Sequence, residues 1–263
     1  MPELPEVETV VQSLTPLLTG HVIRSATFSS RHVTRGDLAS AGRAIEGATV
    51  NRVERRGKHI LLHLDRGFLH IHLGMTGAML WNGIPGPHTR AVIQFDNGTL
   101  VYNDIRQFGR MNFYSSLPSS VAALGPEPLQ ISFEEFWARL HVRRAHIKPL
   151  LLNQGFMGGL GNIYVDESLF AAQLHPKARA DRLSRSRASK LFEAIQTVLR
   201  RAIENRGSSI SDYVDTNGAK GGFQHLHQVY GKAGSKCVRC GGVIRRTVIA
   251  QRGTHFCPKC QRI

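Results

Sequence analysis

The first eight residues of the chain bring a potential nucleophile and several carboxylates together, in the order Met1-Pro2-Glu3-Leu4-Pro5-Glu6-Val7-Glu8. If Met1 is removed, Pro2 offers a free secondary amine that can attack an electrophilic carbon and form an iminium (Schiff base) adduct. A terminal amine has a reference pKa of roughly 8, so it is deprotonated at neutral pH far more often than a lysine. The alternative is that the prolines start a helix and the glutamates interact with its dipole.

Four cysteines near the C-terminus have the spacing of a metal site. They form two CxxC pairs, Cys237 with Cys240 and Cys257 with Cys260. Paired CxxC motifs place four thiolates at tetrahedral spacing, which predicts one Zn²⁺. Because all four ligands come from the protein, we expect this zinc to be structural. The alternatives are two disulfides or a redox pair.

The segment between the two cysteine pairs predicts a β-hairpin, with strands at residues 243–250 and 254–256. Its predicted tip is Gln251-Arg252-Gly253. A solvated surface arginine is the alternative interpretation of Arg252. The metal site would hold the hairpin rigidly, and Arg245 and Arg246 lie nearby. Both features favour a role for Arg252 in binding a phosphate group.

Composition narrows the class of partner. The chain has 34 Lys and Arg against 19 Asp and Glu, a formal charge of +15. This excess favours nucleic acid, although a ribosomal or membrane-surface protein would have a similar balance. No apolar run approaches the ~20 residues that cross a bilayer, and the acidic N-terminus does not resemble a signal peptide. We therefore expect a cytoplasmic protein with no membrane partner.

The predicted secondary structure that positions these residues begins with a helix and continues with short strands. Apolar residues at helical spacing predict a first helix that stops by Gly20, with Pro16 ending or kinking it early. Short strands are then predicted at 21–28, 49–55, 59–64, 68–73, 91–95, 100–103 and 111–114, which suggests a sandwich or barrel.

After a linker rich in Pro, Ser, Gly and Ala, the apolar residues recur at helical spacing. Helices are predicted at 133–141, 147–152, 163–172 and 187–206, and Ser132 is the expected N-cap of the first of these, with Glu135 three residues on. Residues 207–222 are rich in glycine and serine and predict a mobile loop.

Six motifs in this order resemble the bacterial formamidopyrimidine-DNA glycosylase family (Fpg, or MutM). They are the opening Pro2–Glu8 motif, Arg56-Gly57-Lys58, His72-Leu73-Gly74-Met75-Thr76-Gly77, Asp104-Ile105-Arg106-Gln107-Phe108-Gly109, Gly159-Leu160-Gly161-Asn162-Ile163-Tyr164, and the zinc hairpin. The resemblance covers essentially the whole chain. It implies a multidomain α+β fold with DNA lying in a cleft between the domains.

The implied domains have these boundaries. Residues 1–116 would form the catalytic helix and a β-sandwich, and 117–131 a linker. Residues 132–228 would form a helix-two-turn-helix DNA-binding domain, whose loop 207–222 closes over the lesion and reads it with Ser208, Ser209 and backbone amides. Residues 229–263 would form the zinc finger.

The resemblance also implies a reaction, bifunctional glycosylase and AP lyase activity on oxidised purines in duplex DNA. The damaged nucleotide is flipped out of the helix, and the nitrogen of Pro2 displaces the base and forms a Schiff base with the sugar. Both flanking phosphates are then cut by β- and δ-elimination. Glu3 resembles the acid/base at the sugar ring oxygen, Lys58 the proton donor of β-elimination, and Arg252 the phosphate-gripping residue of δ-elimination.

Further residues resemble the family's DNA contacts. Three side chains would fill the gap left by the flipped base, Met75, Arg106 and Phe108. Without the resemblance, ordinary core packing would be the preferred interpretation of Met75 and Phe108. Asn162, at the start of a helix, suits a backbone phosphate, and the remaining candidates are His88, Arg144 and Lys148.

Three other functions compete with this interpretation. The endonuclease VIII-like branch shares Pro2, Glu3, Lys58 and the zinc finger but prefers oxidised pyrimidines; Leu4 and the gap-filling trio favour the purine branch. A DNA-damage binding protein without catalysis would have lost Pro2, Glu3 or Lys58, and a zinc-ribbon module alone would not explain the opening motif. A monomer is expected, with Met1 removed in the active form.

Overall fold

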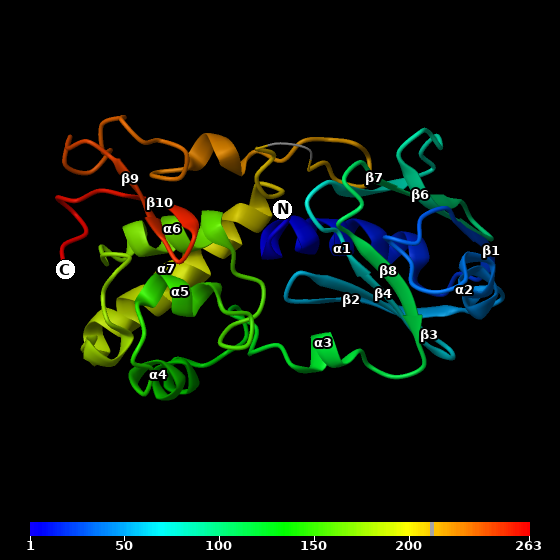
Figure 1. The fold of residues 1–263 in the computed structure, drawn as a ribbon, viewed down its shortest axis with the longest axis horizontal. Helices are drawn as coiled ribbons and strands as arrows, with labels where there is room; N and C mark the ends of the chain where they lie inside the picture. The colour runs from blue at the N-terminus through cyan, green and yellow to red at the C-terminus, as the bar shows by residue number, and fades with distance from the viewer. Residues whose placement is uncertain (211–212) are drawn as a thin grey trace. The chain divides into compact units, whose positions relative to one another are not determined.

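The computed structural model describes residues 1–210 and 213–263, which form two compact units (Figure 1). The first unit comprises Met1–Ala123 and Asn205–Gln224, and the second comprises Leu124–Glu204 and His225–Ile263. The structure thus groups residues 205–224 with the N-terminal part, whereas the domain prediction placed them with the helical part.

The first helix, α1 (Leu4–Leu18), has an apolar face that is buried in the core of the first unit. It packs against β2 and β3 and lies beside the strands in Figure 1. Pro16 does not end α1 early, contrary to the sequence-based expectation. A proline in the last turn removes one N–H, and the helix still closes through the bond from Thr19 N to Thr15 O.

Two antiparallel four-stranded sheets share that core. One has the order β1-β6-β7-β5 and the other β2-β3-β4-β8. The strands are β1 (Ile23–Phe28), β2 (Val50–Arg56), β3 (His59–Leu64), β4 (Gly67–His72), β5 (Gly77–Trp81), β6 (Thr89–Phe95), β7 (Thr99–Asp104) and β8 (Arg110–Tyr114). The seven predicted strands are present, and the predicted sandwich is confirmed as two sheets on one core.

Three elements of the first unit had no clear sequence signal, and one of them, α3 (Ser119–Ala122), lies in the predicted linker. Strand β5 is short and follows a tight turn, and α2 (Leu38–Ile45) buries only Gly42 and Ile45. Helix α2 packs on β1 and β8. The Cβ of any residue at position 42 would come 2.3 Å from the carbonyl oxygen of Ala26, so this close approach requires glycine. The short helix α3 follows β8.

The second unit is helical apart from its C-terminal hairpin. Its helices are α4 (Phe133–His141), α5 (Ile147–Leu152), α6 (Asn162–Ala171) and α7 (Arg185–Glu204), with a short 3₁₀ turn at Ala180–Arg182; a second such turn, Phe223–Leu226, begins in the first unit. Ser132 caps α4, as predicted, by accepting a 3.2 Å hydrogen bond from Glu135 N. A turn at 154–156 and a bend at 157–159 join α5 to α6, which agrees with the predicted helix-two-turn-helix arrangement.

The C-terminal hairpin consists of β9 (Arg245–Ile249) and β10 (Arg252–Phe256), and β10 packs on α6. The turn residues are Ala250 and Gln251, with φ of 47° and 59°. Two successive left-handed residues are typical of a type I′ turn. The tip therefore lies one residue earlier than predicted, and Arg252 opens β10.

Across the residues that the structure describes, no helix has the length and apolar character needed to span a bilayer.

Candidate active site and metal centre

Two glutamates fix the N-terminus of α1. Glu6 accepts a 2.7 Å hydrogen bond from the backbone N–H of Glu3, and the Glu3 side chain accepts in return from the backbone of residue 6. This reciprocal capping box holds the residue that follows Pro2 in one conformation. Pro2 and Glu3 are both buried, while Met1 is half exposed.

The glycine- and serine-rich loop is attached to the same end of α1. The Glu6 carboxylate accepts a second 2.7 Å bond from the backbone N–H of Ser208, and the Tyr213 hydroxyl donates to Glu6 O at 3.3 Å. A Cβ at Gly207, whose φ is +73°, would lie 2.5 Å from Glu6 Oε1. The segment is also bonded back on itself and to β5, through Gly222 N to Asn205 O and Trp81 N to Thr216 O. These bonds explain why 205–224 belongs to the first unit.

The predicted lesion-reading residues are partly described. Ser208 is buried, and the Ser209 hydroxyl donates to Tyr213 O at 2.7 Å and accepts from Gly221 N at 2.9 Å. Residues 211–212 of the predicted loop lie outside the described residues. The loop 207–222 stays a predicted lesion-reading element.

Lys58 lies in the tight turn that joins β2 to β3. Gly57 precedes it with a φ of +58°, and the lysine is 7% exposed. An ion pair braces this turn: Arg55 Nε donates to Glu8 Oε2 at 2.6 Å and Arg55 donates again to Gly57 O at 3.1 Å. Because Glu8 lies on α1, the Arg55–Glu8 ion pair connects the turn that carries Lys58 to the helix that starts beside Pro2.

The three predicted gap-filling side chains are exposed on two neighbouring loops of the first unit. Met75 is 38% and Phe108 51% exposed, and the Arg106 guanidinium lies 4.6 Å from the centre of the Phe108 ring. The core-packing alternative for Met75 and Phe108 is therefore wrong.

The loops that carry these side chains interlock. A Cβ at Gly74, whose φ is +62°, would come within 2.4 Å of Gly109 N, and one at Gly109 within 1.8 Å of the Tyr102 hydroxyl. The backbone of the 73–77 turn therefore touches the backbone of 108–109, and only glycines allow the approach.

In the second unit, two side chains converge on the hairpin backbone next to Arg252. Lys148 Nζ donates to Gly253 O at 3.0 Å, and Asn162 Nδ2 donates to the same oxygen at 2.9 Å. Lys148 is also paired with Asp166 at 2.6 Å, both being fully buried. Asp166 accepts further from His255 N at 2.8 Å. The predicted DNA contacts Lys148 and Asn162 thus bond to the hairpin that presents Arg252.

Three further predicted contacts are exposed. Arg252 stands at the start of β10, Arg144 lies between α4 and α5, and His88 lies in the loop before β6. The peptide N–H of Asp104 donates to His88 O at 2.9 Å, which fixes the backbone at His88 while its side chain remains exposed. The contacts of these residues with DNA stay predictions.

The four cysteines form the zinc site. Their sulfur atoms all lie within 4.8 Å of one another, and no other group of three or more potential metal ligands occurs in the described part of the chain. None of the four is in a disulfide. Four thiolates at this separation fit a tetrahedral Zn²⁺ with no open position, so the ion holds the hairpin in place and takes no part in chemistry.

Three residues have structural roles at the site that the sequence did not predict, although Glu6 was already a candidate for proton transfer beside Pro2. Glu6 had a local signal, because Glu3-x-x-Glu6 is the spacing of a capping box. Asp104 lies in a quoted motif but carried no predicted role, and Asp166 had no signal. Both are fully buried carboxylates, and each bonds to a side chain distant in sequence, Asp104 to Thr76 and Asp166 to Lys148.

Comparison with known proteins agrees with this architecture. Residues 1–111 match the formamidopyrimidine-DNA glycosylase N-terminal domain, 124–214 its H2TH domain, and 234–263 the zinc finger found in FPG and IleRS. A formamidopyrimidine-DNA glycosylase of Solibacter usitatus is 51% identical over 266 residues, covering 100% of both chains.

Solved structures give the same result. The MutM (Fpg) protein of Thermus thermophilus is 40% identical with a TM-score of 0.89, covering 99% of this chain and 98% of that one. A Lactococcus lactis FPG variant in complex with Fapy-dG containing DNA is 35% identical with a TM-score of 0.90, covering 100% of both chains. From its three matched domains and from full-length relatives at this identity, the chain belongs to the formamidopyrimidine-DNA glycosylase family.

Proposed function

We propose that this protein is a DNA glycosylase and AP lyase of base excision repair that removes oxidised purines, such as 8-oxoguanine and formamidopyrimidines, from duplex DNA. The observation that carries the proposal is the N-terminus of α1. There Glu6 bonds at 2.7 Å to Glu3 N and at 2.7 Å to Ser208 N, so one carboxylate fixes both the segment at Pro2 and the predicted lesion loop. Family membership supplies the reaction class.

The proposed reaction begins on a chain from which Met1 has been removed, because an amide nitrogen has no nucleophilic lone pair. The Pro2 nitrogen attacks C1′ of the flipped nucleotide, and the bond from C1′ to the base breaks with the electron pair leaving on the base. Glu3 protonates the ring oxygen as the sugar opens, which gives the iminium between Pro2 and C1′.

Two eliminations follow from that iminium. Loss of a proton from C2′ expels the 3′ phosphate, and the second elimination expels the 5′ phosphate, so no oxidant or reductant is required. Lys58 donates a proton linked to the first elimination. Arg252, held on the zinc hairpin, grips phosphate during the second.

The remaining predicted residues bind the DNA. Met75, Arg106 and Phe108 enter the gap left by the flipped nucleotide, where the guanidinium can donate to the unpaired base and the ring can stack. Asn162, His88 and Arg144 contact the DNA backbone, whereas Lys148, predicted from the resemblance as a further contact, is buried against Asp166 and supports the hairpin backbone beside Arg252. One copy of the chain suffices, and the protein works where bacterial DNA lies, in the cytoplasm.

Borohydride trapping tests the proposal. We expect a covalent adduct on a duplex carrying 8-oxoguanine opposite cytosine, and no adduct with Pro2→Gly, because glycine at that position is a poorer and more flexible amine. Intact mass should show that Met1 is absent from the active protein. A duplex carrying an oxidised pyrimidine is the comparison substrate.

The other outcomes identify the competing functions. An adduct formed chiefly on the pyrimidine duplex would assign the protein to the endonuclease VIII-like branch. Tight binding to both duplexes without any adduct would indicate a damage-binding protein and would reject the catalytic roles of Pro2, Glu3 and Lys58.

A further inference from the structure

The connection between β1 and α2 is bonded to the loop that carries Arg106 and Phe108, the gap-filling pair. Ser30 lies in this connection and is 5% exposed, and its hydroxyl donates a 2.6 Å hydrogen bond to Gln107 Oε1. Gln107 is the residue between the two members of the pair. The bond therefore joins the gap-filling pair to a segment that none of the six family motifs includes.

The Ser30 hydroxyl has one proton, and its hydrogen bonds determine where that proton lies. Val33 N donates to Ser30 Oγ at 3.4 Å, so the hydroxyl accepts from this side and gives its own proton to Gln107. The Gln107 amide, whose oxygen accepts, is thereby fixed in one orientation. Val33 N and Thr34 N also donate to Ser30 O, at 3.2 and 2.9 Å, so the turn that begins at Ser30 does not depend on the hydroxyl.

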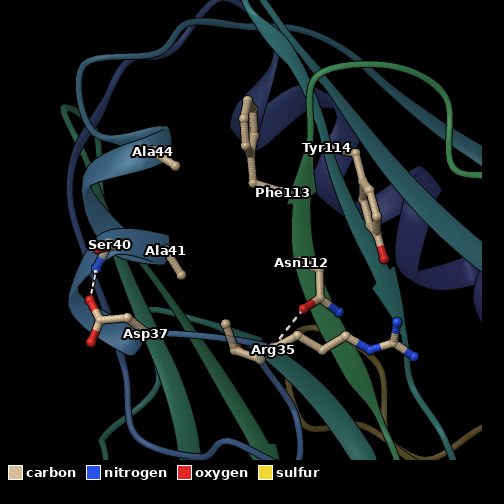
Figure 2. A pocket seen from close by; sticks show the side chains of 9 residues that line it. Arg35, Asp37, Ser40, Ala41, Ala44, Asn112, Phe113 and Tyr114 are labelled. Atoms are coloured by element: carbon tan, nitrogen blue, oxygen red, sulfur yellow. Dashed lines mark hydrogen bonds between the residues drawn. The ribbon is translucent and has the colours of Figure 1, made fainter.

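The connection that carries Ser30 is anchored to both sheets. The peptide N–H of Ser29 donates to β6 at 2.9 Å, and β8 donates to Val33 O at 3.0 Å. Arg35 N donates to Asn112 Oδ1 at 2.8 Å, a bond that Figure 2 shows beside a cavity of about 360 Å³ between α2 and β8. Ser30 is therefore held in place by the sandwich itself.

Gln107 has a backbone conformation that is strained for any residue with a side chain. Its φ is +54°, in the left-handed region. Such a conformation persists only where the surrounding contacts hold it. Here the Ser30 hydroxyl holds the side chain, and Arg110 Nη1 donates to Gln107 O at 3.3 Å. Loss of the Ser30 hydroxyl would remove a contact that opposes relaxation of this residue.

The conformation of Gln107 determines how Arg106 and Phe108 face each other. A rotation about φ of one residue turns the chain on one side of that residue relative to the other side. In the structure the Arg106 guanidinium lies 4.6 Å from the centre of the Phe108 ring, a cation–π contact. The loop is held separately through the N–H groups of Arg106 and Gly109. The bond from Ser30 therefore acts on the part of the loop between them.

We propose that Ser30 is a positioning residue for the gap-filling pair. Its hydroxyl keeps Gln107 left-handed, and this conformation places the Arg106 guanidinium over the Phe108 ring. The inference rests on the proposed function, in which the guanidinium donates to the base left unpaired by the flipped nucleotide. Bases differ in the donors and acceptors that they present. A misplaced guanidinium should therefore discriminate less between cytosine and adenine opposite the lesion.

The position of the pair can be measured by NMR in the intact protein without DNA. The Phe108 ring shifts the resonance of the Arg106 Nε–H, because the guanidinium lies over the ring. We expect Ser30→Ala to move this resonance toward the value of an arginine without an aromatic neighbour. The matched control is Ser29→Ala, which removes a hydroxyl of the same connection that donates to Thr89 O at 2.8 Å. This control should leave the resonance unchanged.

A second variant tests whether Ser30 acts through Gln107. Gln107→Met keeps a side chain of similar length without the amide oxygen, and it should move the same resonance. Ser30→Ala added to Gln107→Met should have no further effect, because the bond is already absent. Additive shifts in the double variant would show that the two residues act independently and would overturn the proposal.

The effect on recognition follows from binding to duplexes that carry a tetrahydrofuran analogue of an abasic site opposite cytosine or adenine. We expect the wild type and Ser29→Ala to prefer the cytosine duplex. Ser30→Ala should lower this ratio of Kd values by about fivefold, as expected for the loss of one hydrogen bond. An equal affinity of the wild type for both duplexes would overturn the proposal.

The two measurements together decide the role of Ser30. An Arg106 resonance that stays unchanged in Ser30→Ala, or a ratio of Kd values that stays unchanged although the resonance has moved, would overturn the proposal. Failure of borohydride trapping in the wild type would reject the proposed catalysis. It would leave both measurements interpretable, because neither requires turnover.

Discussion

The buried carboxylate of Asp104 and the hydroxyl of Thr76 are joined by a 2.5 Å hydrogen bond that connects the two loops carrying the gap-filling side chains. Asp104 is fully buried at the end of β7 and also accepts from Gly109 N at 2.8 Å. Thr76 in turn accepts from Arg106 N at 3.0 Å. One carboxylate therefore fixes the backbone beside Met75, Arg106 and Phe108.

We predict that Thr76→Val loosens both loops and slows lesion excision. The substitution leaves a charged buried carboxylate short of a donor, which costs about 1–3 kcal/mol. The single-turnover rate of excision on the 8-oxoguanine duplex should fall by about tenfold, because about 1.4 kcal/mol corresponds to a factor of ten. The thermal unfolding temperature should also fall. Thr76→Ser keeps the hydroxyl and should retain most of both properties; equal losses in the two variants would contradict the role assigned to this bond.

Glu6→Gln is expected to impair both stability and activity. The carboxylate accepts from Glu3 N and Ser208 N, and an amide offers one oxygen and turns its NH₂ group toward one of these donors. The expected loss in the free energy of unfolding is about 1–3 kcal/mol. Denaturant unfolding and borohydride trapping should both report the change. The exposed Glu46→Gln is the control, and a wild-type trapping rate in Glu6→Gln would show that this cap does not position Pro2.

Variants of Lys148 can distinguish a structural role of this lysine from its predicted role as a DNA contact. Its ammonium and Asp166 are both 0% exposed, so Lys148→Met leaves a buried carboxylate with only its contacts to His255 and should cost about 3–5 kcal/mol of stability. The double variant Lys148→Met/Asp166→Leu should recover part of that loss in denaturant unfolding. If Lys148→Met instead keeps wild-type stability and weakens only DNA binding, the lysine acts as a backbone contact.

Acid should destabilise the first unit through its buried histidines. Burial holds the folded-state pKa of His70 at about 4, below its ordinary value of 6.5. The unfolded chain therefore binds more protons between these pH values, and the free energy of unfolding falls as pH drops from about 6.5 to about 4. His70→Phe should flatten this part of a stability-against-pH curve measured with denaturant. An unchanged slope would show that the pKa of His70 is the same in the folded and the unfolded protein.

Removal of zinc should disorder the hairpin that presents Arg252. The four cysteines surround a closed site, and structural zinc sites contribute directly to folding. A chelator should lower thermal stability and abolish the second elimination, and added Zn²⁺ should restore both. Gel analysis of the cleaved strand distinguishes the products of one and two eliminations. Retention of both properties after zinc is shown to be gone by metal analysis would contradict the role of the ion.

The features that the sequence determined are those with a local cause. Two CxxC pairs define the zinc ligands because spacing along the chain is enough to bring four sulfurs together. The cap at Ser132 and the helical spacing of apolar residues in α1 also depend on neighbours only a few residues away. The motifs that resemble the family were read from the same short segments.

Tertiary structure decided what depends on distant partners. Lys148 is predicted as a DNA contact from the family resemblance, yet its burial follows from Asp166 and from Gly253, which is 105 residues away. The attachment of Ser208 to Glu6 spans 202 residues. The bond from Ser30 to Gln107 joins residues that are 77 positions apart. Burial and hydrogen bonding between remote segments arise only when the chain has packed, so no pattern within one segment encodes them.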